Sequence, residues 1–192
     1  GKTAGAARVA SEVDKEIYAH GVSVVEVKRS TGNDMAMVRG SKFNRRITSA
    51  TPMAFAGPVK GSELVQTRFS PDGMKTRGTN NNCANGYTPW GTYLTAEENF
   101  ANYFSVGDNP SAHEKRWGLR KGGGGGYRWH EHDARFDAVK NPNEPNRFGW
   151  IVEIDPSNPS STPMKRTALG RVKHENAEVV VNADGHVEIG RA

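Results

Sequence analysis

The sequence predicts an all-β protein with long loops and one short helix near the N-terminus. It contains 22 glycines and 10 prolines among 192 residues, and only 35 % of its residues are apolar, which is typical of a loop-rich chain with a thin core. Short alternating segments bounded by turn signals recur along the chain. Their spacing indicates a sandwich, a barrel or a propeller segment, and we treat residues 1–192 as one domain. Four Trp, five Tyr and seven Phe exclude disorder throughout.

The helix is predicted over residues 8–19. Val9, Val13 and Ile17 recur every fourth residue there, which is the spacing of an amphipathic helix, and Gly21 is placed to end it. Residues 21–29 then alternate between valine and polar side chains, which predicts a strand.

Further strands are predicted in the rest of the chain, antiparallel and in meander order. They cover residues 62–69, 92–95, 149–154, 171–174, 178–182 and 186–189. Turn signals separate them at Ser70-Pro-Asp-Gly, Asn85-Gly, Asp155-Pro and Ala183-Asp-Gly. Residues 97–104 are expected to form one or two helical turns.

The segment from about 105 to 145 is predicted to be long and irregular, because it shows little periodicity. It contains five consecutive glycines, Gly122 to Gly126. Neither a following Lys-Ser/Thr nor a strand-to-helix unit accompanies them, so a surface loop is favoured over a phosphate-binding loop.

Charge and apolar runs limit the classes of partner. The formal net charge is +5, but the basic residues are dispersed, so we expect no nucleic-acid partner. An anionic small substrate is equally compatible with this balance. The longest apolar run, around Val179-Val180-Val181, is much shorter than the roughly 18 residues that span a bilayer, so we expect no membrane span.

The densest group of chemically able residues surrounds Cys83, the only cysteine. Three asparagines precede it, and the strand predicted over 92–95 leads into Glu97 and Glu98. Only one of these two carboxylates can face the cysteine if the strand continues, because successive side chains alternate. A thiolate among oxygen donors is a plausible mixed metal site. A buried cysteine in a turn, with two solvated glutamates, is an equally good interpretation.

Two other segments carry polar clusters. On a strand, His130 and His132 would share a face as two ligands of one metal, but the usual zinc signatures are absent. A polar loop in which Trp129 and Phe136 pack is the favoured interpretation. In the strand predicted over 171–174, Val172 and His174 face one side, and Glu175 follows at its end; such a glutamate is normally solvated.

Several long motifs carry a resemblance to a known family. They are the Cys83 segment (79–100) and residues 127–137, 142–156 and 162–175, with shorter pieces at 20–26 and 44–48. In this order they resemble the PhoX family of bacterial alkaline phosphatases, from about residue 18 onward.

The resemblance implies a β-propeller fold, of which this chain would supply about two blades of antiparallel strands. It implies hydrolysis of phosphate monoesters by an exported, periplasmic or secreted enzyme that we expect to be a monomer at full length. Family proteins are roughly three times longer than this chain, so we expect an internal fragment that is inactive alone.

The resemblance also implies a cofactor of iron(III) and calcium ions, with a cysteine thiolate on iron. Cys83 matches that cysteine, Glu175 matches a family glutamate ligand, and Glu98 is the weaker match in the Thr-x-Glu-Glu-Asn motif. No catalytic residue is assigned. Two alternatives stay open, a non-catalytic calcium-binding propeller module and a calcium-dependent propeller esterase or lactonase.

Overall fold

A six-stranded sheet organises the computed structural model, which describes residues 6–122 and 126–190. Its strand order is β6-β5-β10-β9-β8-β7, and all neighbours are antiparallel except β5 and β10. The bounds are β5 (Pro52–Ala56), β6 (Lys75–Arg77), β7 (Asn82–Tyr87), β8 (Tyr93–Glu97), β9 (Ile151–Ile154) and β10 (Met164–Arg166). Strands β7 to β10 therefore form a meander, as predicted, and the parallel β5–β10 pair joins it to the β5–β6 hairpin.

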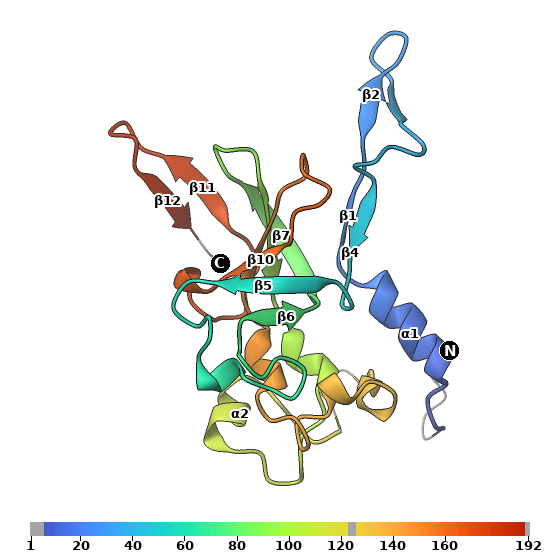
Figure 1. Ribbon diagram of the computed structural model, residues 1–192, viewed down its shortest axis with the longest axis vertical. Coiled ribbons are helices and arrows are strands. Elements are labelled where there is room, and N and C mark those ends of the chain that lie inside the picture. The colour runs from blue at the N-terminus through green and yellow to red at the C-terminus, as the bar shows by residue number, and fades with distance from the viewer. Residues whose placement is uncertain (1–5, 123–125, 191–192) are drawn as a thin grey trace.

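Three two-stranded ladders complete the strands of the described residues. They pair β1 (Val22–Val24) with β4 (Arg45–Ile47), β2 (Val27–Arg29) with β3 (Met35–Met37), and β11 (Glu178–Val181) with β12 (Val187–Gly190). The first two ladders form an arm that projects beyond the sheet (Figure 1). The chain is mostly β with few helices, as predicted. Among the described residues the large sheet stays open, because it ends at β6 and β7.

The N-terminal helix is confirmed as α1 (Ala10–Ala19). Val13 and Ile17 are buried, as their spacing predicts, whereas Val9 precedes the helix and is exposed. They join the largest core cluster, which α1 shares with the segment from Phe100 to Phe148. No helix among the described residues is long and apolar enough to cross a membrane.

The irregular segment from 105 to 145 is confirmed, although short helical turns occur within it. Its helix α2 (Ala112–Arg116) begins at a capping box between Ser111 and Glu114. Short 3-10 turns cover Trp129–Glu131, Ala134–Phe136 and Glu144–Arg147. The helical turn predicted within 97–104 is confirmed as the 3-10 turn Phe100–Tyr103, just before this segment. The glycine run at 122–126 lies partly outside the described residues.

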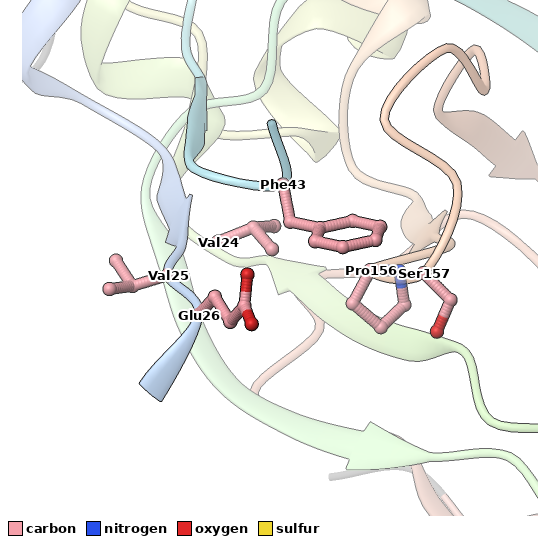
Figure 2. Close-up of a pocket in the computed structure, with 6 residues that line it drawn as sticks. All are labelled: Val24, Val25, Glu26, Phe43, Pro156 and Ser157. Atoms are coloured by element: carbon pink, nitrogen blue, oxygen red, sulfur yellow. The ribbon is translucent and has the colours of Figure 1, made fainter. Parts of the chain in front are cut away.

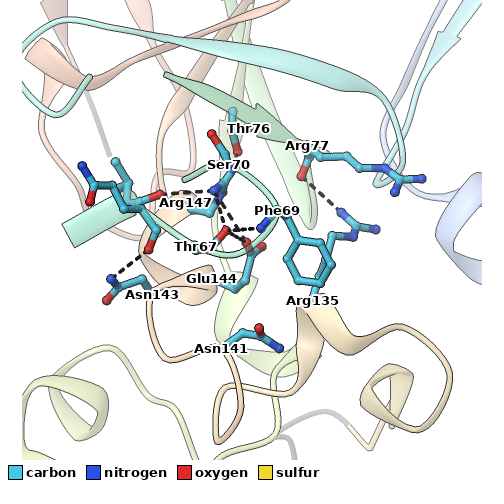
Figure 3. A network of polar contacts seen from close by, with 12 residues as sticks. Thr67, Phe69, Ser70, Thr76, Arg77, Arg135, Asn141, Asn143, Glu144 and Arg147 are labelled. Atoms are coloured by element: carbon cyan, nitrogen blue, oxygen red, sulfur yellow. Dashed lines mark hydrogen bonds and ion pairs between the residues drawn. The ribbon is translucent and has the colours of Figure 1, made fainter. Parts of the chain in front are cut away.

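Buried arginines attach this segment to the sheet (Figure 3). Arg147 donates to the carbonyl of Lys75 on β6 and to the hydroxyl of Thr67, and Thr67 donates to the Glu144 carboxylate at 2.6 Å. The Arg147 and Glu144 side chains are only 3 % and 2 % exposed. Both buried charges, Arg147 and Glu144, therefore have polar partners in the chain between β5 and β6 or on β6 itself. These contacts hold the irregular segment against the β5–β6 end of the sheet.

Several strand predictions were wrong. Residues 62–69 contain a 3-10 turn, Glu63–Val65, because the Ser62 side chain accepts from the Leu64 amide and bends the chain. The strand predicted over 171–174 is absent: Gly170 adopts φ 81°, and the Arg171 guanidinium turns inward over Trp117. Residues 21–29 form two strands with different partners, and Asn85-Gly86 lies inside β7 rather than in a turn. Strands β3, β4, β5, β6, β7 and β10 were not predicted.

The remaining strand predictions are confirmed to within about two residues. They correspond to β8, β9, β11 and β12. The central strand β9 is buried on both faces. Val152 and Ile154 pack into one apolar cluster with Ile47 and Met53, while Ile151 packs into another with Leu94. This two-sided burial makes β8 and β9 the rigid support of the site.

Candidate functional site

Cys83 lies on β7 and is exposed. The interpretation of it as a buried cysteine in a turn is therefore wrong. The β7–β8 register is irregular between Asn82 and Asn85, which are paired with Glu97 and Thr95. Two residues, Cys83 and Ala84, thus lie where one would fit, and such a bulge redirects the side chains of an edge strand.

The two adjacent glutamates have different environments, although β8 ends at Glu97 and Glu98 follows it. Glu97 is fully buried, and its carboxylate accepts hydrogen bonds from Lys165 and from the amides of Gly149 and Trp150 at 2.8 to 3.1 Å. Glu98 is half-buried, and no side-chain partner for it is found within residues 6–122 and 126–190. The structure therefore leaves Glu98, and not Glu97, able to serve a ligand.

Lys165 is the residue that sequence reasoning missed here. Its ammonium lies 2.8 Å from Glu97 Oε1, 2.7 Å from the Arg147 carbonyl and 4.0 Å from the centre of the Phe148 ring. Burial lowers the pKa of Lys165 to about 8, although the Glu97 charge opposes that shift. A lysine between Met164 and Arg166 is usually a surface residue, so no sequence signal pointed to this pair.

Glu175 is exposed and lies in the segment between Gly170 and β11. The amide of its neighbour His174 donates to the Glu97 carbonyl at 3.1 Å. Two residues on, the Ala177 carbonyl lies directly against Gly86, where an added Cβ would be 1.7 Å from that oxygen. The segment that carries Glu175 therefore crosses β7 and β8 close to where Cys83 and Glu98 lie.

Asn81 fixes the other side of this region. Its carbonyl accepts from the Glu98 amide at 3.1 Å, and its side-chain oxygen accepts from the Asn99 amide at 3.0 Å. Asn81 adopts φ 50°, a conformation that is uncommon for residues other than glycine. The chain thus brings together the backbones of the three predicted ligand residues, Cys83, Glu98 and Glu175.

The side chains of these residues carry the types of donor atom that bind metals. A thiolate selects transition metals, and carboxylate or amide oxygens suit calcium. The Asn82 side-chain oxygen, next to Cys83, is buried and finds no hydrogen-bond partner in the described residues. Within residues 6–122 and 126–190, no three or more His, Cys, Asp and Glu side chains lie together in a group that could hold a metal.

The cluster around His130 and His132 is a packed loop, as favoured. Its residues Trp129–Glu131 form a 3-10 turn, so the two histidines do not share the face of a strand. Trp129 and Phe136 are fully buried. Glu131 pairs with Arg128, Asp133 pairs with Arg135, and burial lowers the pKa of His130. These charges are satisfied locally.

An apolar groove beside β1 lies apart from these residues. One part, of about 280 Å³, is lined by Val24, Phe43 and Pro156, and Figure 2 shows their side chains close together while Val25 points away. A second part, of about 390 Å³, continues to Tyr87 and Tyr93. None of the predicted ligand residues lines either part.

Comparisons with known proteins agree on one family. The family described as alkaline phosphatase PhoX matches residues 2–189. Among solved structures, the chain is similar to Pseudomonas fluorescens PhoX in complex with vanadate, a transition state analogue, with 47 % identity and a TM-score of 0.91. The match covers 96 % of this chain and 32 % of that one, so this chain spans about a third of its structural relative. No curated protein matches. The match over nearly the whole chain establishes that it belongs to the PhoX alkaline phosphatase family.

Proposed function

We propose that this chain is part of an enzyme that hydrolyses phosphate monoesters. The observation that carries the proposal is the 47 % identity over 96 % of the chain to a phosphatase bound to vanadate. Vanadate imitates a phosphoryl group during transfer, so a site that binds it is shaped for that reaction. Because the chain spans about a third of that relative, the activity is proposed for the full-length phosphatase.

We also propose that residues 1–192 form part of a β-propeller domain, about two blades of it. The open six-stranded sheet and the separate β11–β12 ladder support this, because both have unpaired edges that further strands can cover.

We propose Cys83, Glu98 and Glu175 as metal ligands, with iron(III) bound by the thiolate and calcium by the oxygen donors. The exposure of Cys83 and the half-buried position of Glu98 support this assignment, since both side chains can reach a ligand. When bound, such metals polarise phosphoryl oxygens and neutralise the charge that develops on them. The chain's own part is positional: the buried Glu97 fixes the end of β8, and the Asn81 carbonyl then holds the backbone amide of Glu98.

The remaining proposals follow from family membership. The substrate is a small phosphate monoester, and the full-length enzyme is an exported, periplasmic or secreted monomer. No nucleic acid or membrane is proposed as a partner.

The test is phosphate release from an aryl phosphate by the full-length protein, with elemental analysis of the same sample. We expect hydrolysis together with bound iron and calcium. Calcium without iron, and no phosphate release, would favour the calcium-binding module. Hydrolysis of carboxylic esters or lactones alone would favour the esterase.

A further inference from the structure

A cavity of about 360 Å³ lies where the end of α1 meets the start of β7. His20, Asn81, Asn82, Tyr103 and Tyr127 line it. Its residues come from four separate parts of the chain, and Cys83, Glu98 and Glu175 are not among them.

The cavity adjoins the proposed ligand residues through the backbone. Asn81 and Asn82 form one wall and lead directly into Cys83. Asn81 also accepts from the amides of Glu98 and Asn99 and donates from Nδ2 to the Tyr103 hydroxyl at 3.2 Å. A group bound in the cavity would therefore lie beside the strands that carry Cys83 and Glu98.

Two tyrosines form the opposite wall. The rings of Tyr103 and Tyr127 stack with centroids 4.5 Å apart and an interplanar angle of 28°. Tyr103 is buried and is hydrogen-bonded to Tyr127, whereas Tyr127 is half-buried and borders the opening. An aromatic surface with polar edges suits the C–H faces of a sugar or polyol.

His20 adds a hydrogen-bond acceptor, its ring atom Nε2, to the lining of the cavity. Its Nδ1 lies 2.7 Å from the Glu16 carbonyl, which can only accept, so Nδ1 carries the proton. In the neutral ring Nε2 then carries the lone pair, and no hydrogen-bond partner for it is found in the part of the chain that the structure describes. Edge-on contacts with Tyr103, Tyr127 and Trp129 at 4.9 to 5.7 Å hold the ring in place.

We propose that this cavity binds the alcohol part of the phosphate ester and selects hydroxyl-rich alcohols, such as glycerol or a sugar. The inference rests on the proposed phosphomonoesterase function. A hydroxyl group can donate to His20 Nε2 and accept from an amide such as Asn81 Nδ2, while the carbon skeleton packs on Tyr127. A plain aryl group lacks the hydroxyls that satisfy these positions.

Two measurements on the full-length protein test it. The first is the ratio of kcat/KM for glycerol phosphate to that for p-nitrophenyl phosphate, in wild type and His20→Ala. Losing the hydrogen bond to His20 should lower the ratio about tenfold. The matched control is His186→Ala, at an exposed position outside the cavity, which should leave the ratio unchanged.

The second measurement is binding of free glycerol by saturation-transfer NMR, which needs no turnover. We expect a signal in wild type that weakens in His20→Ala and persists in His186→Ala. If glycerol binds and neither ester is hydrolysed, the proposed function fails while the cavity assignment stands. If glycerol gives no signal, or if His20→Ala lowers kcat/KM for both esters equally, the cavity assignment is wrong.

Discussion

Lys165 Nζ and Glu97 Oε1 lie 2.8 Å apart, and both side chains are fully buried. They connect β10 to the end of β8, with β9 between them in the sheet. Glu97 also accepts from the amides of Gly149 and Trp150, which precede β9. This pair therefore fixes three strands at the end of β8, immediately before Glu98.

The pair predicts a large loss of stability when one partner is removed. Lys165→Met leaves the Glu97 carboxylate buried without its counter-ion, which costs about 3–5 kcal/mol. The double variant Lys165→Met/Glu97→Gln leaves no unpaired charge and should recover much of that loss.

Urea denaturation gives the free energy of unfolding. Lys121→Met, at an exposed pair with Asp108 whose side chains are both 72 % exposed, should change it little. Equal effects of Lys165→Met and Lys121→Met would contradict the prediction.

The lowered pKa of Lys165 predicts a dependence of stability on pH. The pKa is about 8 in the folded protein and about 10.5 in an unfolded chain. Between these values the unfolded chain holds a proton that the folded protein has released, so the contribution to the free energy of unfolding rises with pH. Below pH 8 both states are protonated, and the contribution is constant.

The measurement is the urea midpoint at pH 7.5 and pH 10, for wild type and for Lys165→Met/Glu97→Gln. Subtracting the double variant removes the titration of all other groups. The advantage of wild type should grow toward pH 10. A difference that shrinks as the pH rises would show that the ion pair outweighs burial and raises the pKa of Lys165.

Part of this fold could be predicted from local patterns. Val13 and Ile17 face the core because they are one helical turn apart, and β8, β9, β11 and β12 contain alternating or continuous apolar residues. Strand β10 could not be predicted, because its central residue is Lys165. Its burial depends on an ion pair with Glu97, which is distant in the sequence. The alternation at 171–174 was misleading, since the Arg171 side chain turns inward onto Trp117 and Phe100.

The candidate site was predictable only through its motifs. Cys83 and Glu175 are 92 positions apart, and the fold brings their segments together through contacts at Glu97 and Gly86. Asn81 adopts a left-handed backbone conformation, but the sequence of three consecutive asparagines does not show which of them does so. The choice of Glu98 over Glu97 also needed the structure, because it depends on Lys165.

Glu97 and Glu98 should respond differently to the same substitution. Glu98→Gln removes a charge from a half-buried side chain, so the fold should persist while bound metal and phosphatase activity fall. Glu97→Gln removes the counter-ion of Lys165 and should lower the free energy of unfolding first. Elemental analysis and urea denaturation of both variants separate the two effects. Normal metal content in Glu98→Gln would remove Glu98 from the ligands.

Cys83→Ser should lower the iron content of the full-length protein and leave calcium at oxygen-donor sites. The hydroxyl replaces a soft thiolate of nearly the same shape and is a poor ligand for iron. Activity on an aryl phosphate should fall by orders of magnitude. Ala84→Ser, which adds a hydroxyl at the next exposed residue, is the matched control and should keep both iron and activity. Full iron and full activity in Cys83→Ser would make the cysteine structural.

We also expect Cys83 Sγ and a Glu175 carboxylate oxygen to lie roughly 3–5 Å apart when metal is bound, close enough to share or neighbour one ion. An experimental structure of the metal-loaded protein measures this distance directly. The prediction is wrong if the two side chains lie on opposite sides of the molecule.

Gly86→Ala should displace the segment that carries Glu175. The added Cβ would lie 1.7 Å from the Ala177 carbonyl oxygen, which is backbone and cannot rotate away, so residues 174–177 must move. Such overpacking costs about 1–3 kcal/mol or more.

Gly190→Ala is the control, because Gly190 is also a strand glycine without positive φ, and a Cβ there meets nothing within 4 Å. Amide hydrogen exchange should show faster exchange at the His174 amide, which donates to Glu97, in Gly86→Ala only. Metal content should fall in the same variant, since Glu175 leaves its position. Unchanged exchange at His174 would show that β7 yields instead of the 174–177 segment, and Glu175 would then keep its place beside Cys83.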